Sequence, residues 1–282
     1  MNITKKNLIN AIEVNVNSAI DEDIKSQDKT SFITSSKLKG LATVKANQNG
    51  ILCGISWFEK TFKKLDPNVK FKWFVDEAAP FSKDQKICEV LGKFNLILSG
   101  ERIALNFLQT LSGTATVTNT YVKKIKSTST KVFDTRKTIP GLRIAQKYAV
   151  KIGGGSNQRL GLYDSILIKE NHIKSVGSIK KIIQLTKEKI KDTSYQIEVE
   201  NLEQLEKAIN NGAKNILLDN FSIKDVKKAI SINKKQAILE ASGNITISNI
   251  LYYAKTGIPR ISIGALTKNV EAIDFSMLIE VI

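Results

Sequence analysis

Cysteine and long apolar runs are scarce in this sequence of 282 residues, and each absence narrows the class of protein. Cys53 and Cys88 form no CxxC pair and lack metal-ligand spacing, so we expect two reduced, buried thiols. No window approaches about 18 uninterrupted apolar residues, so the sequence predicts no membrane-spanning helix. The first segment, MNITKKNLINAIEVN, lacks the apolar core of a signal peptide, and we therefore expect a cytoplasmic protein.

Arginine is scarce as well, because the sequence has 38 lysines but only five arginines. None precedes Arg102, and four of the five lie between Arg102 and Arg159. The planar guanidinium holds a carboxylate or phosphate by two parallel hydrogen bonds, which lysine cannot do. The clustering indicates an anion-binding site in this region, although a set of structural ion pairs would leave the same composition.

The net charge of +16 raises the alternative of a nucleic-acid-binding protein. The lysines are spread along every segment, however, and no alternation of aromatic and basic residues accompanies them. We therefore interpret most lysines as solvated surface and expect no nucleic-acid partner. A cationic surface would still attract polyanionic substrates.

The hydrophobic pattern predicts two structural regions. Residues 1–100 mix helix-like segments with short strands at 50–55 and 71–75, which is typical of an α+β domain. A helical period begins at Glu101, and after Thr130 short strands alternate with amphipathic helices. This alternation favours a parallel sheet with helices outside it, while the apolar C-terminal segment is expected to pack on the first domain. The later strands are expected at 131–134, 165–169, 195–199, 215–218, 236–240 and 260–263.

Charged and polar residues stand at the ends of these strands, where active sites of α/β barrels lie. The densest group falls within residues 134–172, which also contain a three-glycine turn. A single acid at a strand end is often a helix cap, but buried charges are costly, so their repetition indicates a site. The candidates are Arg136, Lys137, Lys169, Glu198, Glu200, Asp219, Glu240, Ser242 and Gly264.

Motifs along nearly the whole chain resemble one family, quinolinate phosphoribosyltransferase, the carboxylating nicotinate-nucleotide pyrophosphorylase of NAD biosynthesis. The resemblance is carried by DTRKTIPGLR, GGGSNQRLGLYD and ILIKENH within residues 134–172, by ERIALNFLQTLSGTAT at 101–116, and by IEVEN, LLDN, EASGNI and IGALT. It implies an open, seven-stranded α/β barrel at 111–267. It also implies an amino-terminal α+β open-sandwich domain at 1–110, joined by residues 268–282.

The resemblance also implies the reaction. Phosphoribose passes from phosphoribosyl diphosphate to the ring nitrogen of quinolinate, giving nicotinate mononucleotide, diphosphate and carbon dioxide, with Mg²⁺ as the metal. The two carboxylates of quinolinate call for a basic clamp, and Arg102 would reach it from the neighbouring subunit of a homodimer. The implied substrate-binding residues are Arg102, Thr135, Arg136, Lys137, Gln158, Arg159, Lys169, Glu198 and Asp219.

The remaining roles follow from the same resemblance. Lys137, Glu198 and Asp219 are the expected catalytic residues, and the two acids would also seat Mg²⁺, directly or through the substrate. The expected phosphate-binding residues are Ser242, Gly243, Asn244, Ser262, Ile263, Gly264 and Lys268. The single histidine, His172, could orient Lys169 or a phosphate, and a scaffold role is at least as consistent with the sequence.

Two residues depart from the family pattern, because Gln158 and Lys268 stand where histidine is usual. Gln158 can donate a hydrogen bond to a carboxylate but cannot carry charge, whereas Lys268 keeps a cation.

Two related enzymes remain as alternatives. One is the phosphoribosyltransferase-like protein of molybdenum-transport operons. The other is nicotinate phosphoribosyltransferase, which would bind a single carboxylate.

Overall fold

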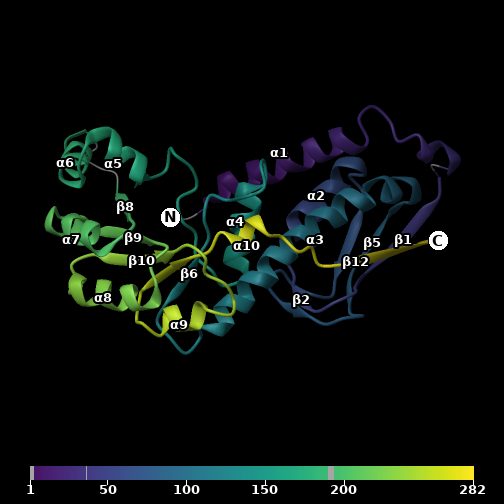
Figure 1. Ribbon diagram of the computed structural model, residues 1–282. Coiled ribbons are helices and arrows are strands. Elements are labelled where there is room, and N and C mark those ends of the chain that lie inside the picture. The colour runs from purple at the N-terminus through teal and green to yellow at the C-terminus, as the bar shows by residue number, and fades with distance from the viewer. Residues whose placement is uncertain (1–2, 36, 190–193) are drawn as a thin grey trace. The chain divides into compact units, whose positions relative to one another are not determined.

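The computed structural model describes residues 3–35, 37–189 and 194–282 (Figure 1). The chain divides into two compact units, each described below by itself. The barrel unit comprises residues 120–137 and 155–265, and the amino-terminal unit comprises residues up to 119, 138–154 and 266–282. Residues 138–154 therefore group with the amino-terminal unit, whereas the boundaries expected from the family placed them in the barrel.

The amino-terminal unit is built on an antiparallel sheet with the strand order β12-β1-β5-β3. The strands are β1 (Lys39–Ala46), β3 (Lys70–Trp73), β5 (Lys86–Lys93) and β12 (Phe275–Val281). Apolar side chains of this sheet share a core with residues of α2 (Ile55–Leu65) and α3 (Phe94–Lys124). The pairing of β12 with β1 confirms that the C-terminal segment packs on the first domain.

The strand expected at 50–55 is wrong in extent. Its first two residues form β2 (Gly50–Ile51), which pairs with β4 (Pro80–Phe81). Gly54 then takes a positive φ of 114°, and α2 begins at Ile55. The carboxylate of Glu77 accepts hydrogen bonds from the backbone N–H groups of Gly54 and Ile55, which satisfies the start of that helix.

A second core explains why residues 138–154 belong to this unit. Ala145 and Ala149 of α4 (Arg143–Ile152) are fully buried in one cluster with Trp57 and Leu111. The helix predicted from Glu101 is confirmed within α3, whose residues Ile103, Phe107, Leu108 and Leu111 are all buried. The other helices of the unit are α1 (Lys5–Asp23), the 3-10 helix η1 (Thr30–Ile33) and most of α10 (Ala265–Lys268). Cys53 and Cys88 are free and buried, as expected.

The barrel unit contains an entirely parallel sheet with the strand order β6-β11-β10-β9-β8-β7. The strands are β6 (Lys131–Phe133), β7 (Ile166–Ile168), β8 (Tyr195–Val199), β9 (Asn215–Asp219), β10 (Ile238–Ser242) and β11 (Arg260–Ser262). The helices are α5 (Glu170–Val176), α6 (Ile179–Lys189), α7 (Leu202–Asn210), α8 (Ile223–Asn233) and α9 (Ile250–Ala254), and α10 (Ala265–Lys268) follows β11. The predicted alternation of strands and helices is confirmed, and all carboxyl ends of the strands meet at one edge of the sheet.

Two details of the sheet differ from expectation. The described sheet has six strands, and a single parallel bridge from Phe133 to Ser156 marks where a further segment meets β6. Strand β10 begins two residues later than predicted, because Lys234 and Lys235 take positive φ values of 45° and 62° and the Asn233 side chain bonds both backbone groups of Ala237. Within the described ranges, no helix is both long and apolar enough to cross a membrane.

Candidate functional site

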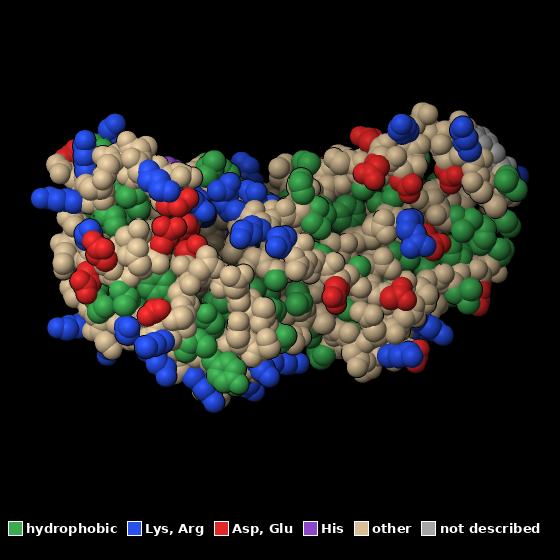
Figure 2. Space-filling view, viewed as in Figure 1, with side chains coloured by type: hydrophobic (Ala, Val, Ile, Leu, Met, Phe, Trp, Pro, Cys, Tyr) green, Lys and Arg blue, Asp and Glu red, His purple; other side chains and the backbone are tan. Residues whose placement is uncertain are grey.

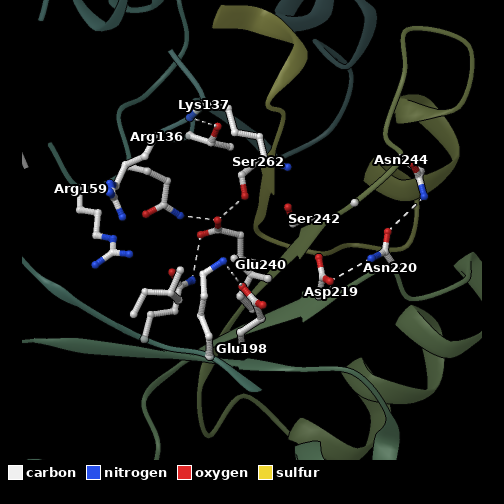
Figure 3. Close-up of a pocket in the computed structure, with 17 residues that line it drawn as sticks. Arg136, Lys137, Arg159, Glu198, Asp219, Asn220, Glu240, Ser242, Asn244 and Ser262 are labelled. Atoms are coloured by element: carbon white, nitrogen blue, oxygen red, sulfur yellow. Dashed lines mark hydrogen bonds and ion pairs between the residues drawn. The ribbon is translucent and has the colours of Figure 1, made fainter. Parts of the chain in front are cut away.

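A cavity of about 500 Å³ opens at the carboxyl ends of the barrel strands (Figure 3). Its size is within the range of small-molecule sites, and every lining residue belongs to the barrel unit. Seven of the nine strand-end candidates therefore converge, whereas Glu200 lines a separate cavity and Gly264 is not among the lining residues. The lining residues are Thr135, Arg136, Lys137, Gln158, Arg159, Leu167, Lys169, Gln196, Glu198, Leu217, Asp219, Asn220, Glu240, Ser242, Gly243, Asn244 and Ser262.

Four cations line this cavity. Arg136 and Lys137 follow β6, Arg159 follows the glycine turn, and Lys169 follows β7. Burial lowers the pKa of Arg159, and the nearby Arg136 guanidinium lowers it further. The Nε atom of Arg136 is buried and has no hydrogen-bond partner among the described residues. Two guanidiniums in each other's field, one with an unsatisfied donor, form a site suited to an anion.

A buried carboxylate fixes the segment that carries Arg159. Asp134 is fully buried, and it accepts hydrogen bonds from the Asn157 side chain at 2.7 Å and from the backbone N–H of Gln158 at 2.8 Å. Arg159 in turn donates from Nη1 to the carbonyl oxygen of Ser165 at 3.0 Å. Hydrogen bonds therefore fix both the backbone of the preceding residue, Gln158, and the guanidinium of Arg159.

Two acids face the cavity from neighbouring strands. Lys169 Nζ lies 3.6 Å from Glu198 Oε2, and Asp219 accepts a hydrogen bond from the Asn220 side chain at 2.9 Å. Burial raises the pKa of Glu198, the Lys169 cation lowers it, and the Asp219 and Glu200 carboxylates raise it further. Glu198 and Asp219 thus form a carboxylate pair of the kind that stabilises developing positive charge.

Glu240 lies within the wall of the cavity and is fully buried. It accepts hydrogen bonds from Ser262 Oγ, from Gln158 Nε2, and from Gln196 Nε2 at 3.1 Å (Figure 3). Burial raises the pKa of Glu240, and these three donors oppose that rise. Glu240 was a strand-end candidate without an assigned role, and Gln196 and Asn220 were not predicted. Gln196 lies two residues before the predicted site residue Glu198, so the two-residue period of a strand could have indicated it.

The first predicted phosphate turn adopts a geometry that requires glycine. Gly243 has a φ of 93°, and a Cβ atom there would lie 2.1 Å from Asn220 Oδ1. Asn220 and Asn244 also take positive φ values, and their side chains are hydrogen-bonded at 3.2 Å. The backbone of this turn thus approaches the end of β9 closely and lines the cavity through Ser242, Gly243 and Asn244.

The second predicted phosphate turn contributes less to the cavity. Ser262 lines it, but Ile263 is buried and its backbone N–H donates to Phe133 at 2.9 Å. The Ile263 amide is therefore already used in pairing with β6. A Cβ atom on Gly264 would lie 3.0 Å from the side chain of Lys137, so this glycine makes room for that cation.

Two predicted residues belong to the amino-terminal unit, which is described by itself. Arg102 is exposed on α3 and lines a separate cavity of about 440 Å³ in that unit, together with residues of α1. Lys268 is exposed at the end of α10. Their roles at the barrel site remain predictions.

His172 contacts Lys169 rather than the cavity. Its Nδ1 atom accepts the backbone N–H of Lys169 at 3.0 Å, which caps the start of α5. Of the roles considered from the sequence, this geometry matches a scaffold residue that orients Lys169.

The chain matches two family models over most of its length. The amino-terminal domain model of quinolinate phosphoribosyl transferase matches residues 28–112, and the C-terminal domain model matches residues 114–278. A probable nicotinate-nucleotide pyrophosphorylase [carboxylating] of Methanocaldococcus jannaschii is 40% identical over 258 residues, covering 88% of this chain and 89% of that protein. A protein of the same description from Bacillus subtilis is 38% identical, covering 91% and 89%.

A solved structure agrees with these matches. The nicotinate-nucleotide pyrophosphorylase from Francisella tularensis superposes with a TM-score of 0.93 at 42% identity, covering 96% of each chain. Fold and site together define a barrel enzyme that binds an anionic substrate at the carboxyl ends of parallel strands. The chain belongs to the quinolinate phosphoribosyltransferase family.

Proposed function

We propose that this protein transfers phosphoribose from phosphoribosyl diphosphate to quinolinate, releasing diphosphate and carbon dioxide and forming nicotinate mononucleotide for NAD biosynthesis. The observation that carries the proposal is the cluster of four cations in one strand-end cavity of a chain from this family. Quinolinate presents two adjacent carboxylates, and a pair of guanidiniums beside two lysines is a matching set of donors.

We assign the clamp on quinolinate to Arg136, Arg159 and Lys169, with Gln158 beside them and Thr135 shaping the loop. The Thr135 hydroxyl accepts the backbone N–H of Lys137 at 3.1 Å, which fixes the start of that loop. The Arg136 Nε donor gains its partner when a carboxylate binds, so binding relieves a cost that the free protein bears.

We assign the ribose to Glu198 and Asp219. As the bond from C1 to the diphosphate oxygen breaks, positive charge develops on the ribose ring, and two nearby carboxylates stabilise it. Lys137, packed beside Gly264, supplies a cation for the departing diphosphate. The 5′-phosphate fits the turn at Ser242, Gly243 and Asn244, where the backbone leaves no room for a side chain.

The chemistry needs no general base. The ring nitrogen of quinolinate attacks C1 with its own electron pair, and the resulting pyridinium accepts the electrons left when the C2 carboxylate leaves as carbon dioxide. A proton from solvent then replaces that carboxylate at C2. A site without a histidine among its lining residues is therefore sufficient.

Mg²⁺ is part of this proposal. Among the described residues no group of three or more histidine, cysteine or acidic side chains could hold a metal, so the protein offers at most the pair Glu198 and Asp219. Such a pair fits Mg²⁺, which typically binds one or two carboxylates together with substrate phosphates and waters. The ion supplies charge neutralisation at the diphosphate.

The proposal extends to a cytoplasmic homodimer in which Arg102 of one subunit enters the barrel site of the other. A nucleic-acid role is not favoured, because lysine and arginine side chains are interspersed with acidic ones over the face in Figure 2. The cationic surface instead suits polyanionic substrates.

Purified protein tests the proposal when it is supplied with phosphoribosyl diphosphate, Mg²⁺ and quinolinate labelled at the C2 carboxyl. We expect label release equal to the nicotinate mononucleotide formed, and neither without phosphoribosyl diphosphate. Nicotinate should be rejected strongly, because a site built for two carboxylates leaves buried cations unpaired when one is missing. Equal turnover of nicotinate would favour nicotinate phosphoribosyltransferase, and no turnover of either acid would favour the molybdenum-associated relative.

A further inference from the structure

The buried carboxylate of Glu240 determines how the Gln158 side chain is oriented. A carboxylate only accepts hydrogen bonds, so the Gln158 amide must turn its nitrogen towards Glu240, as it does. That amide has a second N–H group, which would donate to a carboxylate of the substrate.

Glu240 is itself held in place from two other strands. Gln196 of β8 donates to its Oε2 atom at 3.1 Å, and Ser262 of β11 donates to its Oε1 atom. Glu240 therefore connects β8, β10 and β11 to the segment after the glycine turn. Because the backbone of Gln158 is already fixed by Asp134 at 2.8 Å, its side-chain amide is the part that Glu240 controls.

This network also forms a wall between two cavities of the barrel unit. A second cavity of about 260 Å³ shares Gln158, Arg159 and Gln196 with the substrate cavity. It is further lined by Tyr195, whose hydroxyl is buried and has no hydrogen-bond partner among the described residues.

We propose that Glu240 is a positioning residue that acts through Gln158 to set the affinity of the site for its dicarboxylate substrate. Gln158 is adjacent to Arg159 in the chain and lines the same cavity, so the orientation of its amide is part of the surface that quinolinate meets. The inference rests on the proposed function and adds to it a positioning role for Glu240, to which that function assigns no contact with the substrate.

Two conservative variants test separately whether the length or the charge of the Glu240 side chain matters. Glu240→Asp keeps the carboxylate but shortens the side chain, so that it no longer reaches Gln158. Glu240→Gln keeps the reach and one acceptor oxygen for Gln158 but removes the charge. We expect the KM for quinolinate to rise about tenfold in Glu240→Asp and not to rise in Glu240→Gln, which also removes a negative charge from the cavity lining. In both variants kcat and the KM for phosphoribosyl diphosphate should stay within about twofold.

A double variant tests whether Glu240 acts through Gln158. In a Gln158→Ala background, Glu240→Asp should change the KM for quinolinate no further, because the residue through which it acts is gone. Tyr195→Phe is the matched control, since it removes a buried polar atom from the same wall without touching the network, and its kinetics should equal those of the parent.

The outcomes are distinct. An unchanged KM in Glu240→Asp, a persistent effect in the Gln158→Ala background, or an equal loss for both substrates would overturn the inference. A rise in Glu240→Gln without one in Glu240→Asp would also overturn it, because charge rather than reach would then matter. Failure of the parent protein to turn over quinolinate would instead reject the proposed function.

Discussion

Replacing Arg136 with lysine should move affinity and stability in opposite directions. The Nε atom of Arg136 is buried without a partner among the described residues, and leaving such a donor unsatisfied costs the free protein about 1–3 kcal/mol. Lysine has no donor at that position, so the Arg136→Lys variant should unfold at the same temperature as the parent or a higher one. In the same variant, a substrate carboxylate loses the hydrogen bond that Arg136 Nε would donate to it.

The loss of affinity can be estimated from the same contact. A hydrogen bond to a charged group contributes about 1.5–3 kcal/mol, so quinolinate should bind about 10- to 100-fold more weakly to Arg136→Lys. Arg159→Lys should lose similar affinity but also some stability, because its guanidinium anchors to Ser165 at 3.0 Å. Calorimetric titration with quinolinate and thermal unfolding measure the two quantities separately.

Charge-conserving controls come from Arg143 and Arg260, which do not line the cavity and have no assigned role at the substrate. Arg260 stacks over Phe133 at 5.3 Å, and Arg143 donates to Thr138 in the amino-terminal unit at 3.2 Å. Arg260→Lys and Arg143→Lys should leave quinolinate affinity within about twofold. If all four variants bind alike, or if Arg136→Lys loses stability without losing affinity, the reasoning from the unsatisfied donor is refuted.

Two further predictions concern the assembly and the acid pair. Arg102→Ala and Asp219→Ala should each be nearly inactive, and mixing them should restore part of the activity if the site is shared, whereas no recovery after demonstrated subunit exchange would count against sharing. Because burial raises the pKa of Glu198 and its ionised form is the useful one, kcat should fall on the acidic side at a pH above the ordinary glutamate value of 4.5. Glu200→Gln removes a carboxylate that raises this pKa, so it should move the acidic limb of the pH profile to lower pH, and a limb that stays in place would exclude Glu198 as its cause.

The fold could be predicted where the signal is periodic. The helix from Glu101 and the alternation of strands and helices after Thr130 can be predicted from the spacing of apolar residues. That spacing depends only on which side chains are buried. The failures are local backbone events. Gly54 with its positive φ converts a predicted strand into a helix start, and the turn at Lys234 delays β10 by two residues. Apolar spacing carries no information about left-handed residues, so these boundaries required the structure.

The residues of the candidate site that lie at strand ends could be predicted from the sequence. Arg136, Lys169, Glu198 and Asp219 lie in one cavity because parallel strands end at the same edge. The partners within the wall were not predictable in the same way. The bonds from Gln158 and Gln196 to Glu240 depend on the register of three segments far apart in the chain, and the sequence does not encode that register locally.

The charge balance of the cavity bears on the proposed homodimer and the proposed Mg²⁺. Within the described lining, four cations face three carboxylates, Glu198, Asp219 and Glu240, so the barrel cavity has little excess positive charge. A dicarboxylate together with a phosphorylated sugar diphosphate brings far more negative charge than this excess can neutralise. Repulsion among these groups would oppose their simultaneous binding unless further cations enter. The proposals of Mg²⁺ at the diphosphate and of Arg102 from a neighbouring subunit supply such cations. A barrel site taken by itself should therefore bind either substrate better than both together, and subunit assembly would be a condition of catalysis.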